Sequence, residues 1–146
     1  MLTVEPQVIE KYVKTGKAKL VFRDVLNHGE RSVRMSEAAA CAGKQNKFWE
    51  MHGILFERQD DTYNASSGVA LIALAKNHAS TIQGLDINAF AQCMESRATW
   101  KAIQAADAEQ RGRGITSQPI FEINGTRLVG LQSLDVMSAA IDKALK

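Results

Sequence analysis

The chain has 146 residues, 45% of them hydrophobic, and a formal net charge of +2. A chain of this length buries roughly 70% of its unfolded surface, so its apolar content excludes a disordered protein. The small net charge gives no reason to expect a nucleic-acid or acidic-membrane partner, and no apolar run approaches the ~20 residues of a membrane span.

The first third of the sequence predicts two helical segments with a strand between them. Residues 4–15 carry apolar side chains at helical spacing, and Gly16 is a suitable residue to follow the helix end. Residues 19–25 are rich in strand-forming side chains. Ser32 is expected to cap a longer helical segment that breaks near Gly43.

The middle of the sequence predicts three further helices. Residues 60–67 are polar and are expected to form a connector, and residues 69–78 are expected to form a short apolar helix. Asp86 has the side chain of a good N-cap for a helix that carries Cys93. Residues 97–111 are expected to form the last helix of this part, which makes the middle of the chain almost wholly helical.

Residues 115–130 predict a β-hairpin. Pro119 suits the first position of a strand because it has no N–H to give to a neighbouring strand. Asn124 and Gly125 both tolerate positive φ, which is typical of a two-residue type I′ turn. Ser133 is expected to cap a final helix. The apolar positions of that helix are Leu134, Met137, Ile141 and Leu145.

The order of these elements resembles the DsbA-like thioredoxin-fold disulfide oxidoreductases. The segments that carry the resemblance are, in chain order, EPQVIEKYVKTGKAKLVFRD, SEAAACAGKQNKFWEMHGILF, FAQCMES and TSQPIFEINGTRLVG. The resemblance implies an α/β, thioredoxin-like fold with a helical insertion over about residues 32–114, within one domain that spans residues 1–146. It also implies a thiol-disulfide oxidoreductase that forms or isomerises disulfides in exported proteins.

The same resemblance implies an extracytoplasmic location, in the periplasm or cell envelope. The sequence itself opens with no signal peptide, because Glu5 and Pro6 lie where its apolar region would fall.

The family works through a Cys-x-x-Cys pair at the start of its first helix, where the helix dipole stabilises a thiolate, and this sequence contains no such pair. We therefore assign no catalytic residue and expect the chain as given to be redox-inactive. By the resemblance it begins about halfway along that helix, so the central first strand is expected to be missing too. Either the sequence is a fragment, which we favour, or the protein is a non-catalytic binding or scaffolding module with this fold.

A sheet without its central strand would leave two strands incompletely paired. Residues 19–25 would lose a parallel neighbour, and residues 120–124 would gain an open edge. Buried unpaired backbone groups cost about 1–3 kcal/mol each, and open edges favour association. We expect the gap to be filled by a strand of a second copy, which would make a homodimer, by direct pairing of the two strands, or by a repacked helix.

The resemblance assigns roles to two pairs of residues. Pro119 corresponds to the family's cis-proline, which offers backbone groups to an extended or unfolded protein substrate, and Gln118 replaces the small or β-branched residue that usually precedes it. The alternative for Pro119 is a trans proline at a strand start. Cys41 and Cys93 lie where many members carry a structural disulfide, and the alternative is two separate buried thiols.

No metal site and no cofactor are expected from the sequence. The three histidines, His28, His52 and His78, are too far apart for a recognised metal-binding motif and are expected on the surface or in loops. Four large aromatic side chains are expected in the core, namely Phe48, Trp49, Phe90 and Trp100.

Overall fold

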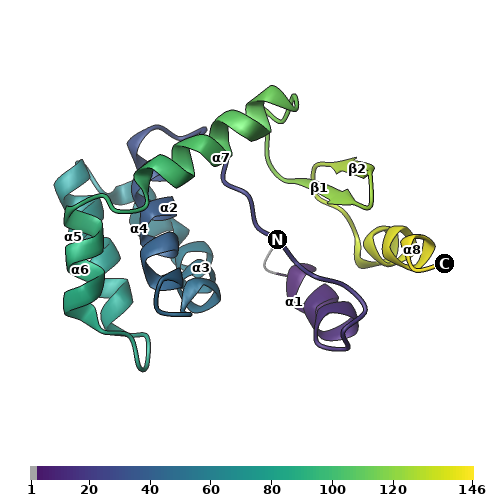
Figure 1. Cartoon of the computed structure of the whole chain (residues 1–146), viewed down its shortest axis with the longest axis horizontal. Coiled ribbons are helices and arrows are strands. Elements are labelled where there is room, and N and C mark those ends of the chain that lie inside the picture. The colour runs from purple at the N-terminus through teal and green to yellow at the C-terminus, as the bar shows by residue number, and fades with distance from the viewer. Residues whose placement is uncertain (1–2) are drawn as a thin grey trace. The chain divides into compact units, whose positions relative to one another are not determined.

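The computed structural model describes residues 3–146 (Figure 1). Their contacts divide into two compact units, of which the first consists of the residues up to Arg23 together with Gly114–Lys146, and the second is Asp24–Arg113. The first unit contains α1 (Glu5–Val8), the π-helical turn η1 (Ile9–Val13), β1 (Ile120–Ile123), β2 (Thr126–Val129) and α8 (Leu134–Ala144). The second contains α2 (Glu30–Gly43), α3 (Phe48–Glu57), α4 (Gln59–Asn64), α5 (Gly68–Ser80), α6 (Ile87–Glu95) and α7 (Trp100–Gly112).

The second unit covers most of the segment in which the sequence predicts a helical insertion, although it begins earlier, at Asp24. The predicted combination of many helices with one β-hairpin is present. The assignment of residues 1–146 to a single domain stays a prediction.

In the first unit, β1 and β2 form an antiparallel hairpin in which Ile120 lies opposite Val129. Asn124 and Gly125 make the turn with φ of 43° and 87°. Two consecutive positive φ values are the requirement of a type I′ turn, so the Asn-Gly pair forms the turn that the sequence predicts.

One face of the hairpin packs on helices from both ends of the chain. Val8, Tyr12, Met137 and Ile141 are buried together, and apolar side chains of the hairpin, among them Phe121, pack against them. Tyr12 is only 1% exposed, and its hydroxyl lies 3.5 Å from the backbone carbonyl oxygen of Ser138. The predicted N-cap of α8 is confirmed, because the Ser133 hydroxyl accepts a hydrogen bond from the Val136 N–H.

The strand predicted over residues 19–25 is wrong. These residues form no strand, and β1 pairs with β2 alone in a two-stranded sheet within the described part of the chain. Direct pairing of residues 19–25 with β1, one of the three ways in which the gap was expected to be filled, is therefore wrong as well. Strand-forming side chains do not make a strand without a neighbouring backbone to complete the hydrogen-bond ladder.

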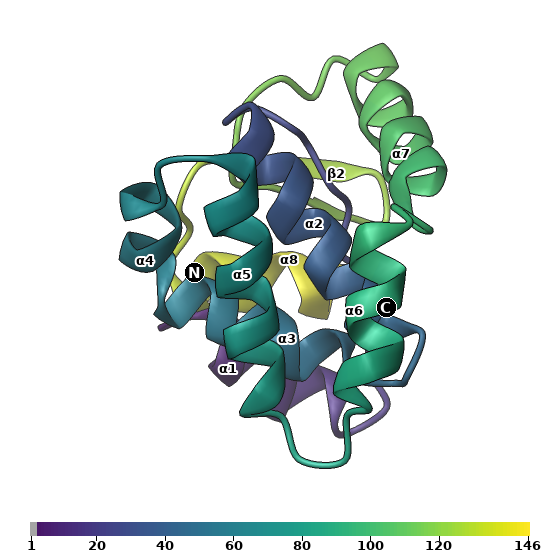
Figure 2. The ribbon, with the colours of Figure 1, turned by 90° about the vertical axis from the view of Figure 1, so that its left-hand side faces the viewer.

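In the second unit, α2 is the central helix and contacts α3, α5, α6 and α7. Figure 2 shows α5 and α6 lying side by side in front of α2. Small side chains on α2, such as Ala38 and Ala42, are fully buried and allow the neighbouring helices to approach. Larger side chains fill the space between the helices, among them Met51, Phe90 and Met94, each 0% exposed.

Several helix limits in the second unit differ from the sequence prediction. The helix predicted over residues 97–111 is α7, which begins at Trp100. α2 begins at Glu30, with Gly29 at the N-cap and no side-chain cap, while the Ser32 hydroxyl instead accepts a hydrogen bond from the His28 N–H at 2.8 Å. The polar connector expected over residues 60–67 is largely a helix, α4. The Arg31 guanidinium donates to carbonyl oxygens at the end of that helix, those of Thr62, Tyr63 and Ala65.

The two ends of the second unit are hydrogen-bonded to each other. The Asp107 carboxylate on α7 accepts from the Leu26 N–H at 2.7 Å. The Arg111 guanidinium, one turn further along α7, donates to the Leu26 carbonyl oxygen at 3.2 Å and to Asn27 Oδ1 at 3.1 Å. The chain therefore enters and leaves this unit at neighbouring points.

The helices of residues 3–146 are all too short or too polar to cross a membrane.

Candidate functional site

The loop that leads into β1 carries the two residues predicted to bind substrate. The peptide bond between Gln118 and Pro119 is cis, Gln118 is exposed and Pro119 is half-buried. The Pro119 carbonyl oxygen accepts a hydrogen bond from the Gly130 N–H at 2.9 Å, which ties the loop to the end of β2. Both predicted residues therefore lie at the entrance to the hairpin.

The hydrogen-bond pattern of the hairpin leaves backbone groups at its edge directly after Pro119. Because the Gly130 N–H donates to the Pro119 carbonyl, Ile120 and Val129 form a non-hydrogen-bonded pair. In such a pair the N–H and C=O groups of both residues point away from the partner strand. The Ile120 backbone groups thus point to the edge of β1 opposite β2, where the described residues provide no further strand.

Exposed apolar side chains lie beside this loop. Val129 is 63% exposed and Leu131 is 75% exposed, on either side of Gly130. Val129 faces the same side of the sheet as the cross-strand pair Glu122–Arg127, whose Arg127 Nη2 and Glu122 Oε1 lie 2.8 Å apart. The loop and its neighbours therefore offer backbone hydrogen-bonding groups next to an apolar surface.

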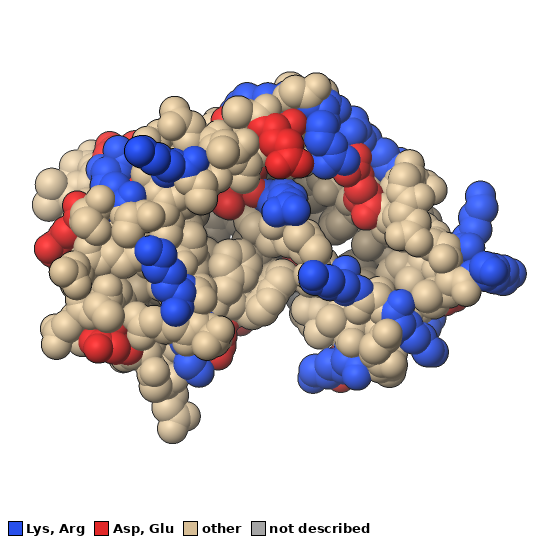
Figure 3. All heavy atoms as spheres, in the orientation of Figure 1, with Lys and Arg blue, Asp and Glu red and all other residues tan. Residues whose placement is uncertain are grey.

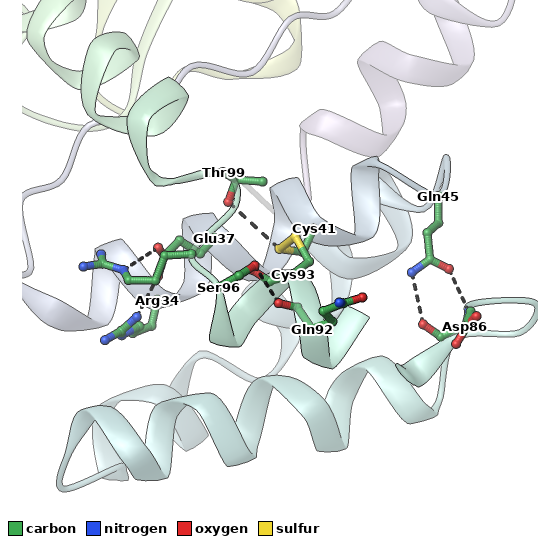
Figure 4. The surroundings of a disulfide bond; sticks show 10 residues. Arg34, Glu37, Cys41, Gln45, Asp86, Gln92, Cys93, Ser96 and Thr99 are labelled. Carbon is green, nitrogen blue, oxygen red and sulfur yellow. Dashed lines mark hydrogen bonds and ion pairs between the residues drawn. A yellow bond between two sulfur atoms is a disulfide. The ribbon is translucent and has the colours of Figure 1, made fainter. Parts of the chain in front are cut away.

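The second predicted pair belongs to the other unit. Cys41 of α2 and Cys93 of α6 form a disulfide with a Cα–Cα distance of 5.8 Å, and 52 residues separate them in the sequence (Figure 4). The alternative of two separate thiols is not what the structure contains. Since these are the two cysteines of the sequence, neither supplies a free thiolate in this state.

Sequence reasoning missed an ion-pair network next to this disulfide. Glu37 lies one turn before Cys41 on α2 and its side chain is 0% exposed. Its two carboxylate oxygens accept from Arg34 Nη1 at 3.0 Å and from Arg97 Nε at 2.9 Å. Figure 4 shows Glu37 and Cys41 on the same side of α2. The sequence carried a signal for this pair once Cys41 is assumed to bond to Cys93. Glu37 lies four residues before Cys41 and Arg97 lies four residues after Cys93, so two antiparallel helices would bring Glu37 and Arg97 together.

A hydroxyl also lies close to the disulfide. The Thr99 Oγ1 atom is 4.0 Å from the Cys41 sulfur, and Thr99 is 7% exposed (Figure 4). Because a disulfide sulfur carries no proton, the hydroxyl is the donor in this weak contact.

The prediction that the histidines lie on the surface or in loops is wrong for two of the three. His52 on α3 is 6% exposed and His78 on α5 is 3% exposed. Burial lowers the pKa of His52 to about 4, and it lowers the pKa of His78 as well, because the protein interior disfavours the charged imidazolium. Within residues 3–146, no three His, Cys, Asp or Glu side chains are grouped to hold a metal ion.

The aromatic side chains expected in the core are divided between core and surface. Phe90 is fully buried, whereas Trp49 is 44% exposed, so the prediction is wrong for Trp49. The Trp49 ring lies edge-on to Phe48 and His52, with ring centroids 5.1 and 5.3 Å away. Leu145, an apolar position of the predicted final helix, is the C-cap residue after α8 and is exposed.

Charged side chains of both signs are interspersed on the face of the molecule seen in Figure 3. Charged side chains also pair with one another in the helical unit, such as Lys76 with Glu95 at 2.5 Å and Lys47 with Glu50 at 3.1 Å.

Comparison with known proteins adds the family. A thioredoxin family model matches residues 2–143. A protein of Rickettsia conorii and one of Rickettsia felis, each named "Putative protein-disulfide oxidoreductase", are 25% and 26% identical over 145 residues, which is 99% of this chain and 50% of each relative. A Salinispora tropica protein named as a Na(+)/H(+) antiporter is 29% identical over 146 residues, 96% of this chain but 20% of that protein.

The chain spans about half the length of the Rickettsia relatives that it matches. The family model covers nearly the whole chain, and the predicted order of helices, hairpin and final helix is present in the structure. These observations together show that the chain belongs to the DsbA-like thioredoxin-fold family of disulfide oxidoreductases.

Proposed function

We propose that this chain is the substrate-binding part of a thiol-disulfide oxidoreductase that forms or isomerises disulfides in exported proteins, outside the cytoplasm. Family membership and the names of the Rickettsia relatives support the reaction class. The observation that carries the binding role is the loop at Gln118 and Pro119, with the Ile120 backbone groups at an open sheet edge directly after it. The chain's own disulfide supports an oxidising compartment.

In this proposal an extended segment of an unfolded protein lies along the loop. Main-chain hydrogen bonds from an added strand are insensitive to sequence, which suits an enzyme that acts on many clients. Val129 and Leu131 are the exposed apolar side chains beside the loop and would be covered by the bound segment. The exposed edge of β1 also remains our candidate for pairing with a second copy.

The chain as given is proposed to be redox-inactive. A thiolate is the attacking group in disulfide exchange, and both cysteines of this sequence are used in one disulfide of the helical unit. The lack of a free thiolate supports a second candidate function for the protein as a whole, that of a non-catalytic binding or scaffolding module. The coding sequence before Met1 separates the two, because in-frame codons for a strand followed by Cys-x-x-Cys would support the oxidoreductase.

The binding role is tested with reduced, carboxymethylated insulin B chain, an extended polypeptide without free thiols. Titration of the ¹⁵N-labelled chain is expected to shift the amide signals of Gln118, Ile120, Phe121 and residues 129–131. Leu131→Ser should weaken binding by about tenfold, the equivalent of ~1.4 kcal/mol of lost apolar contact. Val69→Ser is the matched control, because Val69 is 79% exposed and lies in the helical unit.

The redox proposal is tested in parallel by the dithiothreitol-dependent reduction of insulin. The chain as given is expected to show the background rate. Peptide-induced shifts confined to residues 24–113, or an equal loss of binding in Val69→Ser and Leu131→Ser, would contradict the assigned binding surface. Turnover that disappears when Cys41 or Cys93 is replaced would contradict the redox-inactive assignment.

A further inference from the structure

Two cross-links join α2 to the end of α6, one covalent and one ionic. Cys41 is bonded to Cys93, and the carboxylate of Glu37, four residues before Cys41, accepts from Arg97, four residues after Cys93. Four residues is about one helical turn, so the two links lie one turn apart along the same helix pair. The ionic link therefore restrains the backbone segment that carries the Cys93 sulfur.

The Arg97 guanidinium has two partners, a carboxylate at its edge and an aromatic ring. Its Nε donates to Glu37, whose side chain is 0% exposed, while the guanidinium carbon lies 4.6 Å from the centre of the Trp100 ring. The second carboxylate oxygen of Glu37 is held by Arg34. Charge-assisted hydrogen bonds with both oxygens engaged fix the carboxylate in one orientation.

The backbone at Arg97 has a conformation in which glycine is ordinarily favoured. The Arg97 N–H donates to the Met94 carbonyl and the Ala98 N–H donates to the Cys93 carbonyl, which is the Schellman pattern at the end of a helix. Arg97 occupies the left-handed position of that motif with φ of 52°, where glycine is the residue of least strain. An arginine at this position brings its guanidinium back to α2 at the expense of backbone strain.

We propose that the Glu37–Arg97 ion pair positions Cys41 and Cys93 for disulfide formation in the folded, reduced protein. The pair fixes the end of α6 against α2 before the covalent bond exists. Closing the disulfide then costs less conformational entropy, because the two sulfurs are already held near each other. Preorganisation of this kind appears as a higher effective molarity of one reacting group for the other. The inference concerns the helical unit and goes beyond the proposed substrate-binding role.

With glutathione disulfide as the oxidant, the reaction proceeds through two exchanges. The thiolate of one cysteine attacks glutathione disulfide, which forms a mixed disulfide and releases one glutathione thiolate. The thiolate of the other cysteine then attacks the protein sulfur of the mixed disulfide, closes the Cys41–Cys93 bond and releases the second glutathione. Two protein thiols are oxidised, one glutathione disulfide is reduced to two thiols, and both protons pass to glutathione.

The test measures this equilibrium for the full chain in glutathione buffers, by mass spectrometry after alkylation of free thiols. The effective molarity of the Cys41–Cys93 pair is expected to fall about tenfold in Arg97→Met. Glu37→Gln should give a similar loss. Arg97→Met is the primary variant, because Arg97 is half-exposed and its loss leaves Glu37 paired with Arg34. Arg97→Lys, which keeps the charge, should restore part of the effective molarity.

The matched control is Glu95→Gln. Glu95 is also an ion-paired carboxylate near Cys93 on α6, but its partner is Lys76 of α5 and its side chain is 64% exposed. Its replacement should leave the effective molarity within about twofold of the parent value, since surface ion pairs contribute little. An equal loss in Glu95→Gln and Arg97→Met, or no loss in Arg97→Met, would overturn the proposal.

A second measurement uses the reciprocity of coupled equilibria. If the ion pair favours the disulfide, the disulfide favours the ion pair by the same factor. Arg97→Met should therefore destabilise the oxidised chain more than the reduced chain in urea unfolding, and a tenfold effect corresponds to a difference of about 1.4 kcal/mol. Equal destabilisation of the two forms would contradict the proposal even if every variant were less stable than the parent.

Discussion

His52 shows how burial changes the chemistry of a single side chain. Its imidazole lies between the rings of Phe48 and Phe56, whose centroids are 5.8 and 4.7 Å from its own. Nothing in the sequence of α3 indicates that a polar residue would be buried there. Burial lowers its pKa to about 4, so the ring is neutral in the folded protein at pH 7. The unfolded chain, in contrast, has the ordinary value of 6.5.

The lowered pKa predicts that stability falls as the pH decreases. Below pH 6.5 the unfolded chain binds a proton at His52, whereas the folded chain does not until the pH approaches about 4. This difference in proton uptake should remove up to about 3 kcal/mol of unfolding free energy between pH 7 and pH 4. His52→Leu should lose this part of the pH dependence, as measured by urea unfolding across that range.

Replacement of His28 provides the control, because His28 is exposed and lies before the first helix of the same unit. His28→Gln is expected to keep the pH dependence of the parent chain. If His52→Leu and the parent lost equal stability between pH 7 and pH 4, the assignment of this effect to His52 would be wrong.

At the level of secondary structure, α6 has a well-defined beginning. The Asp86 carboxylate accepts from the N–H groups of Asn88 and Ala89 at 2.9 and 3.1 Å. The Asp86 backbone is held as well, because its N–H donates to Gln45 Oε1 at 2.7 Å and its carbonyl accepts from Gln45 Nε2 at 3.1 Å (Figure 4). The start of α6 is thus fixed both within the helix and to the segment that follows α2.

Asp86→Ala should destabilise the chain by about 1 kcal/mol, because it removes the side-chain acceptor for two helix N–H groups and leaves the backbone contacts to Gln45 in place. Asp86→Asn keeps an oxygen acceptor and should retain most of the stability. Thermal or urea unfolding of the two variants measures the difference, and equal losses would show that the cap does not act through its acceptor oxygen.

The sequence predicted those elements whose limits depend on neighbouring residues. The caps at Asp86 and Ser133, the Asn124–Gly125 turn and the break after Gly43 all follow from side chains within a few residues. The misassigned elements depend on distant groups. α4 ends where the Arg31 guanidinium, about thirty residues earlier, donates to its last carbonyls, and a sequence pattern does not contain such contacts.

The same distinction applies to the candidate sites. The family resemblance placed Pro119, Cys41 and Cys93, because their motifs are local or shared with the family. Glu37 and Arg97 were missed, since a charged residue is ordinarily solvent-exposed, and it is the packing of the helical unit that buries this carboxylate.

At the scale of the whole molecule, the two units carry different features. The hairpin unit carries the proposed substrate loop, and the helical unit carries the disulfide. The hairpin sheet has two strands within the described residues, so the Ile120 backbone groups lie at an edge to which another strand can add.

The open edge predicts self-association of the chain as given. Sedimentation equilibrium should detect a dimer whose fraction rises with protein concentration. Ile120→Lys should reduce the dimer fraction at any given concentration, because a charged side chain at a strand edge opposes pairing with another strand. Val69→Lys places the same charge on an exposed apolar position of the helical unit and should leave the dimer fraction unchanged. A chain that remains monomeric over the whole concentration range would contradict this expectation.

The hydrogen bonds of Asp107 and Arg111 with Leu26 and Asn27 hold the two ends of the helical unit together, and this has an evolutionary consequence. A segment whose two ends meet can be lengthened, shortened or exchanged without stretching the polypeptide that hosts it, which is why insertions are tolerated where chain ends lie close together. The helical unit thus has the geometry of an inserted segment that can be exchanged. Selection can diversify its surface while the hairpin and its proline loop stay as they are.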